Sequence, residues 1–295
     1  AQTNWAGETI TSNTTKSFSG TVLLNGPIIV DGCTLTIDNT SSTAPLYIKR
    51  NFNGTNYQGT TTEHLNTYKM DMFFIHNNGR IVIKETEATR VIFDGNGKTG
   101  RCFHMVSKTG ANYTTGLDLE YVTIQNMVPQ LPSVTTTTMS GIAIYLNWTG
   151  TGNYSTTYKN SIRLDHVNID NCGDPKPTDP SQIGFGNTDC SIRITAAALT
   201  IFDMSYCKLT NNRGTSTYSG TICAGGPTVC CVMSMDNCES SNNYSSGWGG
   251  VVLWAAGNQY GTNPHGNDVP DAKITIRNSV FHHNQAAYLG GALST

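Results

Sequence analysis

Acidic side chains in a recurring position are the first candidates for chemistry in this chain. Glu120, Asp165 and Asp236 occupy one position of a repeated segment, and Ser205 and Arg277 occupy it in the other copies. Glycoside hydrolysis needs a pair of carboxyl groups, and a calcium-dependent lyase needs an acidic cluster with a basic residue. Here a serine interrupts the acids, and each acid belongs to a separate copy. We therefore expect a solvated face and assign no catalytic residue.

The nine cysteines could form disulfides or bind a metal. The candidate disulfides are Cys207–Cys238, Cys223–Cys230 and Cys172–Cys190. The first pair shares an inward column of neighbouring copies, and stacked parallel strands lie about 4.8 Å apart, within the reach of a disulfide. Burial as free thiols is the alternative. The spacings fit no zinc motif and no phosphate loop occurs, so we expect no metal and no cofactor.

Aromatic residues in or beside two insertions could bind a ligand. The candidates are Trp148, Tyr154, Trp248, Trp254 and Tyr260. Exposed aromatic faces provide stacking platforms for carbohydrate or for a cell-surface protein. In the alternative, Trp254 covers the core and the tyrosines cover the bases of loops.

Sequons for N-glycosylation are a further feature. The candidate sites are Asn13, Asn39, Asn53, Asn112, Asn147, Asn153 and Asn243. They permit a glycoprotein without requiring one.

A repeated segment must position these residues. In each copy an apolar residue is followed by two mostly polar ones, a small or apolar residue, a polar residue and usually a large apolar one. The copies are 119–124, 164–169, 204–209, 235–240 and 276–281. Because a β-strand alternates its faces, two successive outward residues indicate a bend between short strands. The repeat predicts a solenoid whose coils stack as parallel sheets.

Further columns follow the same alignment. One inward column should contain Val122, Val167, Cys207, Cys238 and Ser279, and the next Ile124, Ile169, Leu209, Ser240 and Phe281. The aligned amides of Asn212, Asn243 and Asn284 should bond from coil to coil. A third strand opened by glycine is predicted at 140–144, 220–222, 249–253 and 290–293, with 182–185 as the candidate in the second coil.

Three strands and three corners in each coil predict an all-β chain folded as a right-handed parallel β-helix with three short sheets and long inserted loops. Residues 1–116 have a weaker alternation, and we expect an N-terminal cap with irregular coils there. Residues 117–295 should form the regular coils of the same continuous solenoid. The chain stops within a third strand, so we expect the last coil to be covered by further coils or by another copy, as in a filament.

Composition narrows the class of protein. Only 13% of the residues are charged, and 18 basic against 20 acidic residues leave no cationic surplus for nucleic acid. No apolar run is long enough for a membrane span. The chain begins Ala-Gln, as a mature protein does after removal of a secretory signal, and we expect an exported protein.

The segment 281–293, with Phe281, Asn284 and Gly290-Gly-Ala-Leu293, resembles the F-x-x-N and G-G-A-[ILV] repeat of the polymorphic outer-membrane proteins. Partial echoes occur at Asn212 before Gly220 and at Asn243 before Gly249. The resemblance covers about the last 100 residues. It implies a right-handed parallel β-helix on a cell surface, commonly with a role in adhesion.

We therefore predict a secreted, extracellular structural or adhesive surface protein that displays loops from a β-helix, rather than an enzyme. The alternative is a polysaccharide-active enzyme, because pectate lyases and polygalacturonases also resemble this architecture. Carboxylates converging in a groove would favour the enzyme.

Overall fold

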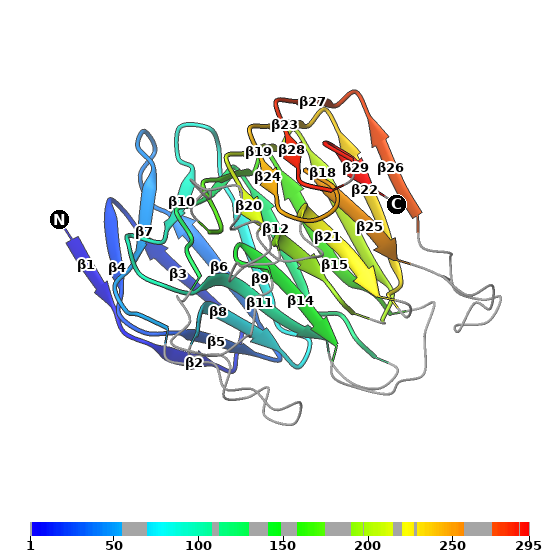
Figure 1. Cartoon of the computed structure of the whole chain (residues 1–295). Coiled ribbons are helices and arrows are strands. Elements are labelled where there is room, and N and C mark those ends of the chain that lie inside the picture. The colour runs from blue at the N-terminus through cyan, green and yellow to red at the C-terminus, as the bar shows by residue number, and fades with distance from the viewer. Residues whose placement is uncertain are drawn as a thin grey trace.

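The predicted parallel β-helix is confirmed in the structure, a computed structural model. It describes residues 2–54, 70–107, 112–129, 141–148, 158–174, 190–196, 198–214, 220–226, 229–256, 273–288 and 290–294. The described chain is all-β, and its strands stack side by side from β1 (Gln2–Trp5) to β29 (Leu293–Ser294), with the two termini at opposite ends of the stack (Figure 1). Among these residues, no helix has the length and apolar character needed to cross a membrane.

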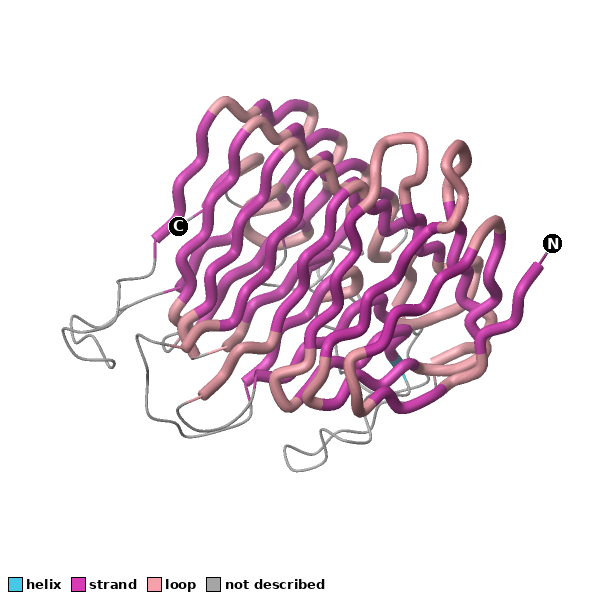
Figure 2. The backbone as a smooth tube through the Cα atoms, turned by 180° about the vertical axis from the view of Figure 1, so that it is seen from behind, coloured by secondary structure: helices cyan, strands magenta, loops and turns pink. Residues whose placement is uncertain are grey.

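Each coil contributes strands to three long parallel sheets, and Figure 2 shows strands of successive coils running side by side. Sheet I contains β3 (Thr14–Phe18), β6 (Thr34–Asn39), β9 (Arg80–Lys84), β12 (Gly116–Glu120), β15 (Asn160–Asp165), β18 (Thr200–Ser205), β22 (Cys231–Asp236) and β26 (Lys273–Arg277). Sheet II contains β1, β4 (Thr21–Leu24), β7 (Leu46–Arg50), β10 (Val91–Asp94), β13 (Val122–Gln125), β16 (Asn168–Asp170), β19 (Lys208–Thr210), β23 (Glu239–Ser241) and β27 (Val280–His282).

Sheet III completes each coil. It contains β2 (Glu8–Ile10), β5 (Ile28–Asp31), β8 (Asp71–His76), β11 (Arg101–Ser107), β14 (Ile144–Trp148), β17 (Cys190–Ile194), β21 (Gly220–Gly226), β25 (Val252–Ala256) and β29. Between sheets II and III, a short sheet is formed by β20 (Arg213–Gly214), β24 (Tyr244–Ser245) and β28 (Gln285–Ala286).

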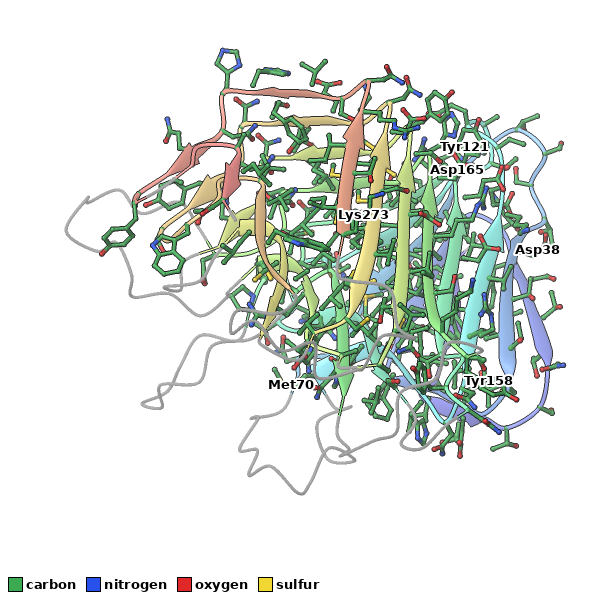
Figure 3. The ribbon with its side chains drawn as sticks, turned by 90° about the vertical axis from the view of Figure 1, so that its right-hand side faces the viewer. Asp38, Met70, Tyr121, Tyr158, Asp165 and Lys273 are labelled. Atoms are coloured by element: carbon green, nitrogen blue, oxygen red, sulfur yellow. The ribbon has the colours of Figure 1, made fainter. Side chains whose placement is uncertain are left out.

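The bend predicted within each repeated segment is a left-handed corner between sheets I and II, hereafter the first corner. One residue per coil takes a positive φ there: Tyr121 (54°), His166 (54°), Tyr206 (53°), Asn237 (52°) and Asn278 (49°). Positive φ is uncommon outside glycine, so its recurrence at one place indicates a geometric requirement of the turn. The corner points this side chain outward, where Tyr121 and Asp165 lie at the end of sheet I (Figure 3).

The inward columns stack as predicted. Val122, Val167 and Cys207 are fully buried in one column. In the next, Ile124 pairs with Ile169, and the pairing continues through Leu209 and Ser240 to Phe281. The core is therefore continuous along the axis, and an interior charge in any coil would face apolar neighbours from two others.

The predicted asparagine ladder also forms. Asn284 Oδ1 accepts the Asn243 backbone N–H at 3.0 Å, and Asn243 Oδ1 accepts the Asn212 backbone N–H at 2.9 Å. Each side-chain nitrogen donates to the preceding strand of sheet II: Asn243 to the Leu209 carbonyl at 2.8 Å and Asn212 to the Ile169 carbonyl at 2.9 Å. These side chains thus satisfy backbone groups that the turn leaves outside the sheets.

The chain from Gln2 lies in the same sheets as the later coils, since β1 pairs with β4, β4 with β7 and β7 with β10. One prediction needs correction, the position of the third strand in the second coil. The third strand of the coil that contains β15 is β17, which pairs with β14 and β21. The segment 182–185 lies outside the described residues.

Candidate ligand-binding groove at the first corner

Aromatic rings stack on the outside of the first corner. The rings of Tyr121 and His166 have centroids 4.3 Å apart with planes at 19°, and those of His166 and Tyr206 are 4.8 Å apart at 15°. This arrangement follows from the fold, because equivalent residues of successive coils are spaced by about one strand separation, which is also a stacking distance. Arg90 lies over the Tyr121 ring at 5.7 Å.

The stack ends at Tyr206, because the next two coils place Asn237 and Asn278 at the same corner. Tyr206 is 53% exposed. Beside it lies a hollow of about 620 Å³, which we call the corner groove. Its end wall includes His166 and Tyr206, and one side includes Asn237 and Asn278. The volume is within the ~300–1,000 Å³ of typical small-molecule sites.

Sheet II supplies the opposite side of the corner groove through Lys208, Glu239, Val280 and His282. Lys208 Nζ lies 3.6 Å from a Glu239 carboxylate oxygen, and His282 Nε2 lies 3.4 Å from the other oxygen. These side chains are partly exposed, so they can donate and accept hydrogen bonds toward the groove. Because the acid and the bases pair with each other, the side carries little net charge.

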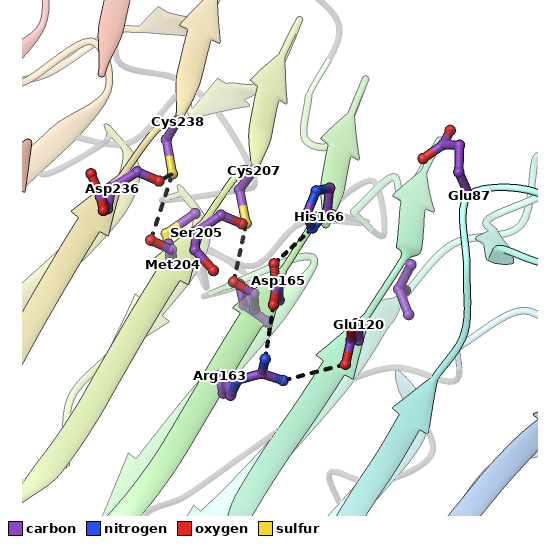
Figure 4. A network of polar contacts seen from close by, with 12 residues as sticks. Glu87, Glu120, Arg163, Asp165, His166, Met204, Ser205, Cys207, Asp236 and Cys238 are labelled. Carbon is purple, nitrogen blue, oxygen red and sulfur yellow. Dashed lines mark hydrogen bonds and ion pairs between the residues drawn. The ribbon is translucent and has the colours of Figure 1, made fainter. Parts of the chain in front are cut away.

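Cys207 and Cys238 line the floor of the groove from adjacent coils. A hydrogen bond from the Cys207 thiol lowers the pKa of the Cys238 thiol, whereas burial raises the pKa of Cys207 well above its ordinary value. The Cys207 thiol also lies 3.3 Å from the Leu164 carbonyl oxygen. Figure 4 shows the two thiols at the first corner of neighbouring coils. Both are free in the structure.

An ion-pair network adjoins the groove on sheet I. Arg163 lies 2.9 Å from Asp118, 3.8 Å from Glu120 and 2.8 Å from Asp165, and Figure 4 shows it between the last two. Hydrogen bonding to Asp118 raises the pKa of the Arg163 guanidinium. Asp165 also contacts His166 Nδ1 at 2.7 Å. Two acids of the predicted solvated column are therefore held by one cation, an interaction that strand alternation does not predict.

A second polar cluster is buried on sheet III. Asp71 is fully buried, and its two carboxylate oxygens lie 2.7 Å from Arg101 Nε and 2.8 Å from His104 Nδ1. Burial raises the pKa of the Asp71 carboxyl, but the two partners lower it by more, so it lies below its ordinary value. The Tyr145 ring stacks on His104 at 5.0 Å. This cluster is closed to solvent and is best understood as structural.

The predicted aromatic candidates do not line the corner groove. Trp254 is only 8% exposed and packs in the main core, as the alternative interpretation stated, so its ring offers no free face. Trp248 is 37% exposed. Trp148 belongs to β14, but its side chain, like Tyr154 and Tyr260, lies outside the described residues.

All nine cysteines are buried free thiols, so none of the three predicted pairs is a disulfide in the structure. Cys172 lies in the main core, whereas Cys190 packs with Cys223 in a separate cluster. Cys230 lies in a third cluster. The two cysteines of the pair Cys223–Cys230 therefore lie in different clusters, and so do those of the pair Cys172–Cys190. Of the three predicted pairs, only Cys207 and Cys238 are neighbours. Among the described residues, no group of three or more His, Cys, Asp or Glu is placed to hold a metal.

The sequons differ in accessibility. Asn13, Asn53 and Asn112 are exposed and Asn147 is half-buried, while Asn153 lies outside the described residues. Two predictions need correction, because the Asn39 and Asn243 side chains are 7% and 1% exposed. Asn39 Nδ2 donates to the Ala44 and Thr89 carbonyls, and Asn243 Nδ2 donates within the ladder. A glycan on either nitrogen is incompatible with this fold.

No family model, curated protein or solved structure matches the chain, so the corner groove must be interpreted from its own geometry.

Proposed function

We propose that this protein is an extracellular, non-catalytic β-helix with a structural and adhesive role, and that it holds its partner in the corner groove. The observation that carries the proposal is the exposed face of Tyr206, at the end of a ring stack and beside a hollow of about 620 Å³. His166 and Tyr121 stack behind the Tyr206 ring and hold it in place. Binding of a partner would therefore reduce the side-chain entropy of Tyr206 only slightly. The low content of charge and the resemblance to surface repeats support the extracellular location.

The pairing of the charged groups beside the groove supports binding. Arg163 lies 2.9 Å from Asp118 and 2.8 Å from Asp165, and Lys208 lies 3.6 Å from Glu239. Carboxylates held in ion pairs can accept hydrogen bonds from a ligand without a proton transfer.

An adhesion assay tests the proposal. Beads coated with the protein should adhere to at least one member of a panel of matrix proteins, mucins and glycans. Adhesion should be lost with Tyr206→Ala and kept with Tyr288→Ala, which removes an exposed ring outside the groove lining. Adhesion that is absent, or equally strong in both variants, would overturn the role of the groove.

A polysaccharide-active enzyme is the second candidate, favoured by the convergence of Asp118, Glu120 and Asp165 around Arg163. Incubation with pectins, alginates and glycosaminoglycans, with and without Ca²⁺, distinguishes the two. We expect no reducing or unsaturated ends. Turnover that Asp165→Asn abolishes would establish the enzyme instead.

A further inference from the structure

We infer that the corner groove binds an uncharged pyranose sugar, with the apolar face of the sugar ring stacked on Tyr206. The inference rests on the proposed function and names the chemistry of the partner. It begins from the ring stack, which places one ring per coil at Tyr121, His166 and Tyr206 and then stops. At Asn237 the corner keeps its left-handed backbone but presents a small amide. A six-membered ring can therefore occupy the next position of the stack.

The polar side of the groove favours a sugar over an aromatic side chain from a protein. A pyranose has an apolar C–H face and a rim of hydroxyl groups, whereas a phenyl ring has no hydrogen-bonding rim. Lys208, Glu239 and Asn237 line the groove beside Tyr206 and can bond such hydroxyls. A phenyl ring in the same position would remove water from these groups without replacing its hydrogen bonds, which disfavours it.

The pairing of charges favours an uncharged sugar. Lys208 lies 3.6 Å from Glu239, His282 lies 3.4 Å from Glu239, and His166 lies 2.7 Å from Asp165. A uronic acid would compete with Glu239 for Lys208 and would meet that carboxylate as a like charge. An amino sugar would meet Lys208 in the same way. Neutral hydroxyls can join the existing pairs without opposing either charge.

The extent of the groove suits a short oligosaccharide. Its lining runs from His166 through Tyr206 and Asn237 to Asn278, which are successive positions of the first corner. Three strand separations of about 4.8 Å make roughly 14 Å along the axis. The Tyr206 end offers the broad phenol face, so the sugar ring stacked there should contribute most of the affinity.

The experiment compares binding of neutral, acidic and amino oligosaccharides by calorimetry, with saturation-transfer NMR to locate the contact on the sugar. We expect a neutral sugar to bind best and the C–H protons of one ring face to receive the strongest transfer. Tyr206→Ala should weaken binding about tenfold or more, and Tyr206→Phe should restore most of it because the ring is kept. Tyr288→Ala should bind as wild type.

A filling variant gives an independent test. Asn237→Tyr should continue the stack within the protein and abolish sugar binding while the fold is kept, because tyrosine already occupies this left-handed corner at Tyr121 and Tyr206. Unchanged binding in Asn237→Tyr, or a preference for acidic or amino sugars, would overturn the inference. Adhesion of coated beads that depends on Tyr206 without binding of any sugar would overturn the inference alone. If the protein shows neither adhesion of coated beads nor sugar binding, the proposed function is overturned as well.

Discussion

Truncation of Asn243 to alanine should destabilise the protein by about 3 kcal/mol, estimated from the hydrogen bonds that the side chain makes. Asn243 Oδ1 accepts the buried Asn212 backbone N–H at 2.9 Å, and its Nδ2 donates to the Leu209 carbonyl at 2.8 Å. After truncation the Asn212 N–H has no partner from the ladder, and the Leu209 carbonyl keeps only a longer side-chain contact, from Ser240 at 3.4 Å. A buried group left unpaired costs about 1–3 kcal/mol, so one full loss and one partial loss give this magnitude.

The measurement is the free energy of unfolding from urea titration, followed by circular dichroism. Asn168→Ala is the matched control, because Asn168 is a half-buried asparagine of β16 on the outer side of sheet II. We expect a loss within about 0.5 kcal/mol for the control. An equal loss in both variants, or less than about 1 kcal/mol for Asn243→Ala, would refute the reasoning that the ladder satisfies otherwise unpaired backbone groups.

Three further predictions concern the buried charge, the thiol pair and the core. Asp71→Asn should cost about 3–5 kcal/mol because Arg101 would remain buried without its carboxylate. Burial raises the pKa of the Asp71 carboxyl, but Arg101 and His104 lower it by more, so the folded pKa lies below the ordinary one. The contribution of Asp71 to stability is therefore present above its ordinary pKa and is lost as the pH falls through the folded pKa, and thermal melts from pH 5 to pH 2 should fall less steeply for the variant. Mild oxidation should link Cys207 to Cys238, as peptide mapping without reduction would detect, and failure to find that peptide would contradict the predicted proximity. Leu209→Asp should prevent folding, seen as loss of the soluble fraction, because it places an unpaired charge between two coils, and a soluble variant with native circular dichroism would contradict this.

The sequence predicted the architecture where its pattern repeats. The columns through Leu209, the bend between the two strands and the ladder at Asn243 follow from residue spacing alone, because stacked coils bring equal positions together. The same alignment contained the signal for the groove, which was missed: Tyr121, His166 and Tyr206 occupy one position of the repeat, and rings at that position must stack. The bend residues were interpreted only as polar and outward.

Other features could not be deduced from the sequence. Asp71 and Arg101 pair through β8 and β11, which precede the region of clear repetition, so no alignment related their positions. The interaction of Arg163 with Asp118 and Asp165 depends on the conformation of a long side chain, which strand alternation does not determine. The third strand at Cys190–Ile194 was missed because it follows a long insertion and is not opened by glycine, the signal used to locate the others.

The stacking of three parallel sheets has a mechanical consequence. Neighbouring coils are joined along the axis by backbone hydrogen bonds in sheets I, II and III, so these bonds point along the direction in which the coils are stacked. A pull along the axis therefore strains the bonds of three sheets at once before any two coils separate. A force applied at one corner instead opens one sheet after another. An anchored β-helix of this kind should resist axial tension much better than sideways peeling, so the direction of the pull would determine how long the protein holds its partner.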